Sequence, residues 1–136
     1  MANKKITDVE GIGPAIGAKL CAVGVKDTDG LLAGCKTPAL RKALAEKTDL
    51  SEKQVLRFAN MADLYRVKGI GSEYADLLEA AGVDTVPELA RRKPDNLCKS
   101  MVELNVVKNL VRRAPTEAEV TDWVAQAKGL PRMLEY

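Results

Sequence analysis

The sequence predicts an all-α protein, and three of its features lead to that fold class. Helix-capping residues stand before apolar stretches, apolar residues recur three and four positions apart, and no stretch alternates apolar and polar residues as a half-buried strand would. Of the 136 residues, 46 % are hydrophobic and 29 % are charged, the balance of an ordinary folded domain. We therefore expect about eight or nine short helices.

An internal repeat organises the chain. The segment Ile6-Thr-Asp-Val9-Glu-Gly11-Ile12-Gly13 is matched 58 residues later by Leu64-Tyr-Arg-Val67-Lys-Gly69-Ile70-Gly71. A second pair of segments, 51–59 and 116–124, matches at an offset of 65, so the second copy carries extra residues, which we place between positions 105 and 115. Because glycines, caps and aromatic residues all fall in register, we interpret the chain as a duplication.

Each expected helix has a start signal in the sequence. Proline suits the first turn of a helix, and Ser or Thr three residues before Glu or Gln makes a capping box. Glycine after the last apolar position closes a helix, as we expect at Gly24 and Gly82. The predicted starts, in chain order, are Pro14, Thr37-Pro38, Ser51-x-x-Gln54, Ser72 as an N-cap, Thr85-x-x-Glu88, Lys93-Pro94 and Thr116-x-x-Glu119.

The repeat divides the chain into two units and a tail: residues 1–63, residues 64–128 and residues 129–136. From residue 51 to about residue 67 there is no Gly or Pro, so we expect one continuous helix over about 51–67 to join the two units. Two equivalent helices carry apolar stripes that we expect to be buried. These stripes are Val55, Phe58, Ala59 and Ala62 in the first unit, and Val120, Trp123, Val124 and Ala127 in the second.

The composition excludes several kinds of site. The chain has no histidine, which removes imidazole chemistry, and its three cysteines show no CxxC spacing for a metal site or a disulfide framework. We expect no metal and no cofactor, and a reducing, cytoplasmic location. Cys21 stands next to Leu20 in an apolar stripe, and we expect it to be a small buried residue.

The sequence contains no signal for catalysis or for membrane insertion. No nucleophile and base form a recognisable set, and no apolar run is long enough to cross a bilayer. We therefore expect a protein that is not an enzyme, with no small-molecule substrate and no membrane partner. The net charge of +2 is too small for a polycationic protein, so any contact with nucleic acid must be local.

Both copies carry a Gly-Ile-Gly corner before a helix. The two glycines allow a positive φ and leave the backbone bare, while the isoleucine between them can plug the core. The helix that follows begins with N–H groups that have no intrahelical acceptor, and with the positive end of its dipole. Such an arrangement can hold an anion.

The pattern Leu64-x-x-Val67-x-Gly69-Ile70-Gly71-x-x-x-Ala75-x-x-Leu78 resembles the helix-hairpin-helix motif. The first copy resembles it as well and departs from it at Gly17, where the family usually has alanine. The resemblance implies a tandem, SAM-like arrangement of two such hairpins, whose turn amides hold a phosphate of a nucleic-acid backbone without regard to base sequence. Carried onto this chain, the phosphate-binding residues are Gly11, Ile12, Gly13, Ala15, Lys19, Lys68, Gly69, Ile70, Gly71 and Ser72.

A Gly-Ile-Gly corner also serves simply to join two helices, and the nearby charges separate the two copies. Glu73 stands in the first helical turn after the second corner, where a carboxylate satisfies the helix dipole and repels a phosphate. The first corner is followed by neutral residues and then Lys19, so we expect it to be the better phosphate site. A candidate basic patch, whose charges could equally cap helix ends in solvent, consists of Arg91, Arg92, Lys93, Arg112 and Arg113.

Over nearly its whole length, from Ile6 to about Leu134, the chain resembles a bacterial family of two tandem helix-hairpin-helix units that is described only as a domain of unknown function. The resemblance rests on the first-copy segment 6–13, on 77–86, on 111–115 and on Trp123-Val124-x-x-Ala127. It is specific for architecture and assigns no chemistry. We expect a non-enzymatic module that binds the backbone of double-stranded DNA. The alternative is a protein–protein interaction or oligomerisation scaffold, whose partner is another protein or a second copy and which binds no nucleic acid.

Overall fold

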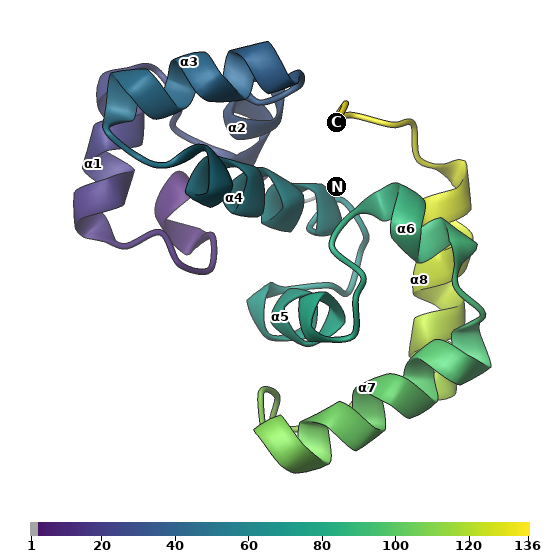
Figure 1. Cartoon of the computed structure of the whole chain (residues 1–136). Coiled ribbons are helices and arrows are strands. Elements are labelled where there is room, and N and C mark those ends of the chain that lie inside the picture. The colour runs from purple at the N-terminus through teal and green to yellow at the C-terminus, as the bar shows by residue number, and fades with distance from the viewer. Residues whose placement is uncertain (1–2) are drawn as a thin grey trace. The chain divides into compact units, whose positions relative to one another are not determined.

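The computed structural model describes residues 3–136, and this part of the chain is helical (Figure 1). It contains eight α-helices and one short 3-10 helix, with a single isolated bridge between Lys5 and Asp27 and no named strand. The all-α prediction, with about eight short helices, is therefore confirmed. The elements are η1 (Ile6–Asp8), α1 (Pro14–Ala22), α2 (Thr28–Gly34), α3 (Pro38–Thr48), α4 (Glu52–Leu64), α5 (Ser72–Ala80), α6 (Val86–Arg91), α7 (Pro94–Lys108) and α8 (Glu117–Gly129).

Most helix starts lie where the capping signals predict them. The hydroxyl of Thr37 accepts the amide of Leu40 at 3.2 Å at the start of α3, and Thr85 accepts the amide of Glu88 at 3.3 Å at the start of α6. Two full capping boxes form, in which side chain and backbone bond reciprocally. They join Ser51 with Gln54 before α4, and Thr116 with Glu119 before α8.

The predicted N-cap at Ser72 is wrong. The N-cap of α5 is Gly71, and Ser72 is the first residue of the helix. The Ser72 hydroxyl lies 2.8 Å from the hydroxyl of Tyr65, a residue that is only 1 % exposed. The physical reason is local competition, because the serine side chain turns to the buried phenol and not to the helix amides.

The chain forms two compact units, and we describe each by itself. One unit contains residues 64–131, and the other contains residues 3–63 together with residues 132–136. We call them the second unit and the first unit. The helix expected to run to about residue 67 ends at Leu64. The chain turns there, and the amide of Val67 donates to the carbonyl of Leu64 at 3.1 Å.

The predicted apolar stripes lie in the cores. Every residue of the two stripes is buried, and Trp123 of α8 is 2 % exposed. In the second unit, α8 packs against both α6 and α7 (Figure 1). Cys21, expected to be buried, is exposed, because one residue turns the helix by about 100° away from Leu20, which is 1 % exposed and faces the core.

The extra residues of the second copy lengthen one helix and the loop after it. Helix α7 has 15 residues and its counterpart α3 has 11. Both end on a C-cap in the left-handed region, Asp49 at φ 58° and Asn109 at φ 50°. The loop folds back onto α7, where the Asn105 side chain accepts from the amide of Val111 at 3.0 Å and donates to its carbonyl at 3.2 Å.

Across residues 3–136, none of the helices combines the length and the apolar character that a membrane crossing requires.

Candidate nucleic-acid interface

The two Gly-Ile-Gly corners have nearly the same backbone. The first glycine of each corner has a positive φ, 88° at Gly11 and 96° at Gly69. The second glycine of each is an extended N-cap, with φ −88° and ψ −176° at Gly13 and φ −101° and ψ −169° at Gly71. The isoleucines between them are 4 % and 3 % exposed and fill the core of their own unit. The repeat therefore preserves local geometry as well as sequence.

The first corner is open to solvent. Gly13 has no side-chain cap, and a Cβ atom placed on it would meet nothing within 4 Å. The next residues, Pro14 and Ala15, are exposed, and the first turn of α1 holds no acidic residue. Because the first amides of a helix have no intrahelical acceptor, those of α1 are donors at a helix start whose first turn holds no carboxylate.

An arginine that the sequence analysis missed lies beside this corner. A Cβ atom on Gly11 would lie 3.0 Å from Nη1 of Arg57 and 3.3 Å from the ring of Phe58. Arg57 belongs to α4, and its guanidinium is half-buried and makes other interactions. The signal was present in the sequence, because Arg57 directly precedes Phe58, whose stripe position places it against the corner. The first corner thus combines bare amides with a cation from a distant helix.

Lys19 supplements this corner and does not form part of it. It is exposed in the last turn of α1, about 9 Å along the helix axis from Gly13 at a rise of 1.5 Å per residue. Its charge therefore contributes to the positive field along the exposed face of α1.

The second corner packs closely against the protein at its first glycine, whereas its second glycine, Gly71, is as open as Gly13. A Cβ atom on Gly69 would lie 2.9 Å from Nε1 of Trp123. The Gln126 side chain accepts from the amide of Lys68 at 2.9 Å and donates to its carbonyl at 3.1 Å. Glu73 is exposed in the first turn of α5, and the Ser72 hydroxyl contacts Tyr65. Two of the predicted second-copy groups, the Lys68 backbone and the Ser72 hydroxyl, are thus already engaged.

The loop with Arg112 and Arg113 lies beside α5, because the Tyr74 hydroxyl donates to the carbonyl of Arg113 at 3.0 Å. The Arg113 guanidinium is paired with the Glu119 carboxylate through two bonds of 2.8 and 3.0 Å. This hydrogen bonding, together with the Thr116 amide, lowers the pKa of Glu119 from 4.5 to about 2. Arg113 is therefore paired with Glu119, whereas Arg112, the other exposed arginine of this loop, forms no ion pair with the described residues.

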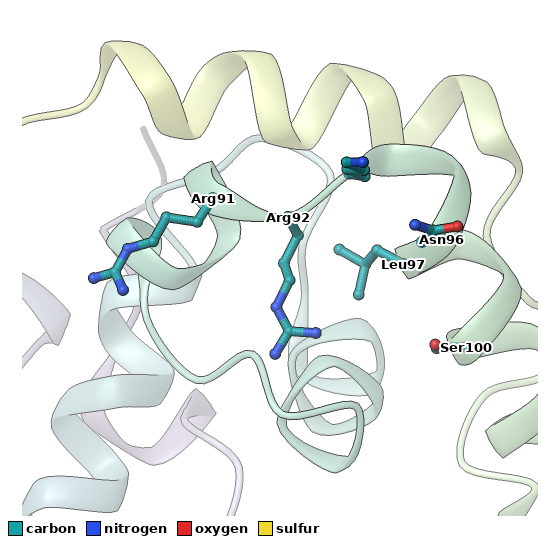
Figure 2. Close-up of a pocket in the computed structure, with 6 residues that line it drawn as sticks. Arg91, Arg92, Asn96, Leu97 and Ser100 are labelled. Carbon is teal, nitrogen blue, oxygen red and sulfur yellow. The ribbon is translucent and has the colours of Figure 1, made fainter.

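The basic run 91–93 lines an open pocket of about 300 Å³ together with Asn96, Leu97 and Ser100. Figure 2 shows that the Arg92 side chain lies opposite Leu97, whereas the Arg91 side chain points away from Leu97. Arg92 is committed to the protein, since its Nε donates to Glu88 at 3.0 Å and its Nη2 to the carbonyl of Gly82 at 3.2 Å. These arginines therefore do not converge on one anion.

The acidic residues and cysteines of the described part of the chain form no cluster that suits a metal ion. No three Cys, Asp or Glu residues among positions 3–136 gather as a metal site would require. Burial raises the pKa of the Cys35 thiol from 9.0 to about 12, which keeps it protonated and unreactive near neutral pH.

Comparison with known proteins gives one match. A family model described as a domain of unknown function, DUF4332, matches residues 10–130. Neither the curated proteins nor the solved structures contain a match. The matched range takes in both corners and most of both copies of the repeat, so this chain belongs to the DUF4332 family.

Proposed function

We propose that the protein binds the sugar–phosphate backbone of double-stranded DNA through the first Gly-Ile-Gly corner and the first turn of α1. The single observation that carries this proposal is that the first turn of α1, behind the open N-cap Gly13, holds no acidic residue, whereas the first turn of α5, behind the equally open Gly71, holds Glu73. In this proposal the two repeats are tandem helix-hairpin-helix units, and the molecule is a cytoplasmic binding module without catalytic activity.

The contrast between the two corners supports different roles for them. They share their backbone conformation, but Arg57 lies over the first corner and Trp123 over the second. A guanidinium beside bare amides favours an anion, whereas an indole and a glutamine side chain complete the packing of a helix junction. We infer that the first corner binds phosphate and that the second corner is structural.

Such contacts fix register and affinity but read no base edges. The amides of the first corner contact one phosphate, and Lys19 adds a charge farther along α1. Because few phosphates are neutralised, the binding is weak and depends on salt with a shallow slope, about 0.9 in logarithmic units for each phosphate.

The test is a fluorescence-anisotropy titration of a labelled DNA duplex at several salt concentrations. Gly13→Val places a branched side chain where the phosphate would approach, and Gly71→Val makes the same change at the matched N-cap of α5. Neither glycine has a positive φ and neither has a neighbour within 4 Å, so both variants fold. We expect Gly13→Val to lose roughly tenfold or more in affinity, and Gly71→Val to bind like the wild type.

Two results would overturn the proposal: no binding by the wild-type protein at low salt, or equal losses in the two valine variants. The same titration with single-stranded DNA and with duplex RNA tests the choice of duplex DNA. A pull-down from nuclease-treated lysate then tests the alternative hypothesis, in which the protein is a scaffold that binds other proteins and no nucleic acid.

A further inference from the structure

Each corner packs against an aromatic ring from a later helix of its own unit. The ring of Phe58 in α4 lies 3.3 Å from the position that a Cβ atom on Gly11 would occupy. Nε1 of Trp123 in α8 lies 2.9 Å from the same position on Gly69. Both rings hold the same place in the second pair of matched segments, so the residues beside them can be compared directly between the two units.

The residue before each ring has the opposite charge in the two units. In the first unit it is Arg57, whose Nη1 lies 3.0 Å from the Cβ position of Gly11, so the guanidinium reaches the corner itself. In the second unit it is Asp122, which is exposed and accepts a bond of 2.8 Å from Nε2 of Gln126. A cation therefore stands beside the first corner at a position where the second unit has a carboxylate.

Arg57 is held more firmly than a surface arginine. It is half-buried, it makes other interactions within the protein, and the next residue, Phe58, is 4 % exposed. The start of its helix is fixed by the capping box of Ser51 and Gln54. A planar guanidinium can bond two oxygens of one phosphate, and a side chain that is ordered in advance loses less conformational freedom on binding.

The residue before each corner also reverses its charge between the units. Glu10 precedes Gly11 and is exposed, whereas Lys68 precedes Gly69. Glu10 is thus the carboxylate nearest in sequence to the first corner, and it too makes interactions within the protein. A phosphate that approaches this corner competes with the Glu10 carboxylate for the charge of Arg57.

We propose that Arg57 is the specificity-determining residue of the first corner, and that its guanidinium bonds the same phosphate that the corner amides hold. The charge at this position then selects the first corner, and not the second, for an anion. This inference rests on the proposed DNA binding and names the side chain that recognises the phosphate. Glu10 is the internal competitor, which the phosphate displaces from the guanidinium.

The test is binding of a labelled DNA duplex at several salt concentrations, measured by fluorescence anisotropy. Arg57→Gln should bind roughly tenfold more weakly, and the slope of log affinity against log salt should fall by about 0.9, because a charged phosphate contact is lost. Arg57→Lys keeps the charge, so its slope should stay near that of the wild type. Asp122→Asn is the matched control in the second unit, and its affinity should change by about twofold or less.

A purely structural role for Arg57 makes the opposite prediction for Glu10. If the arginine only bonded Glu10 and so shaped the corner, Glu10→Gln would weaken duplex binding. If the arginine bonds phosphate, Glu10→Gln removes the competitor, and the affinity should rise roughly threefold. Circular dichroism checks that each variant is folded. Should Arg57→Gln fail to fold, Glu10→Gln decides the question, because it leaves Arg57 in place.

The outcomes separate this inference from the proposed function. If the wild type binds duplex DNA and Gly13→Val binds weakly, but Arg57→Gln keeps the wild-type affinity and slope, the corner remains the site and the role of Arg57 is wrong. A loss of affinity in Glu10→Gln also overturns that role. If the wild type binds no duplex at low salt, the proposed function and this inference fail together.

Discussion

The indole nitrogen of Trp123 lies 2.9 Å from the position that a Cβ atom on Gly69 would occupy. Trp123 is 2 % exposed and comes from α8, more than fifty residues away in the sequence. This approach fixes the second corner against the core of the second unit, and it explains why glycine is needed there for space as well as for its φ of 96°.

Gly69→Ala should therefore destabilise the protein clearly. The new methyl group meets a buried ring, and an L residue at this positive φ is strained, so we expect a loss of about 2 kcal/mol or more in the free energy of unfolding. Chemical denaturation measures it. The matched change Gly71→Ala, with φ −101° and no neighbour within 4 Å, should cost below about 1 kcal/mol. Equal losses in the two variants would contradict the close contact.

Moving a carboxylate between the two helix starts tests the electrostatic part of the proposed DNA binding. Ala15 and Glu73 stand at the same place after their corners, each the second residue of its helix. Ala15→Glu should weaken duplex binding roughly tenfold at low salt, because a negative charge then faces the phosphate.

The same substitution should leave the fold intact, since an acidic residue in the first turn favours the helix dipole. Circular dichroism checks this point, and Glu73→Ala is the control, with an expected change in DNA affinity of about twofold or less. If Ala15→Glu binds duplex DNA as the wild type does, the first corner is not the site.

The Arg113–Glu119 pair gives a pH-dependent prediction. Arg113→Ala should raise the pKa of the Glu119 carboxyl from about 2 toward its usual 4.5, as followed by carbon NMR of the side-chain carboxyl. Arg112→Ala is the control and should leave this pKa unchanged.

The sign of the effect on stability follows from the direction of the shift. The pKa of Glu119 is lowered in the folded protein, so its stabilising contribution is present above about pH 4.5 and is lost as the pH falls toward 2. The contribution is small, because the side chains of Arg113 and Glu119 are 62 % and 34 % exposed. If Arg113→Ala unfolds at neutral pH, the ion pair contributes more to the free energy of unfolding than expected for an exposed pair.

The cysteines should react in a fixed order. Cys21 is exposed, whereas Cys35 is buried and its pKa is raised to about 12. With iodoacetamide at mildly alkaline pH, mass spectrometry should find Cys21 modified first and Cys35 protected until the protein is denatured. Early labelling of Cys35 would mean that the first unit opens readily around the end of α2.

Local signals predicted most of the fold. The starts of α1, α3 and α8 follow from Pro14, Thr37 and the capping box of Thr116, each of which acts on backbone within three residues of itself. The capping patterns predict no start for α2, although Asp27 caps this helix by accepting the amide of Gly30 at 2.8 Å. The wrong N-cap prediction at Ser72 shows the limit of such signals, because the Ser72 hydroxyl hydrogen-bonds to Tyr65, seven residues earlier in the sequence.

The candidate site was predictable only in its backbone. The glycine pattern located both corners, since a positive φ and a bare N-cap are properties of the glycines themselves. What lies over each corner, Arg57 or Trp123, depends on long-range packing that no local pattern encodes. The same holds for Leu134, which is 2 % exposed although no sequence pattern indicates the surface that buries it.

The order of the units along the chain bears on how the protein is made. Residues 132–136 belong to the first unit, while the residues just before them form the second, so in sequence the second unit is inserted into the first. During synthesis the first unit therefore lacks Leu134, a buried residue of its core, until all of the second unit has been synthesised. An early stop anywhere in the second repeat would leave both halves incomplete.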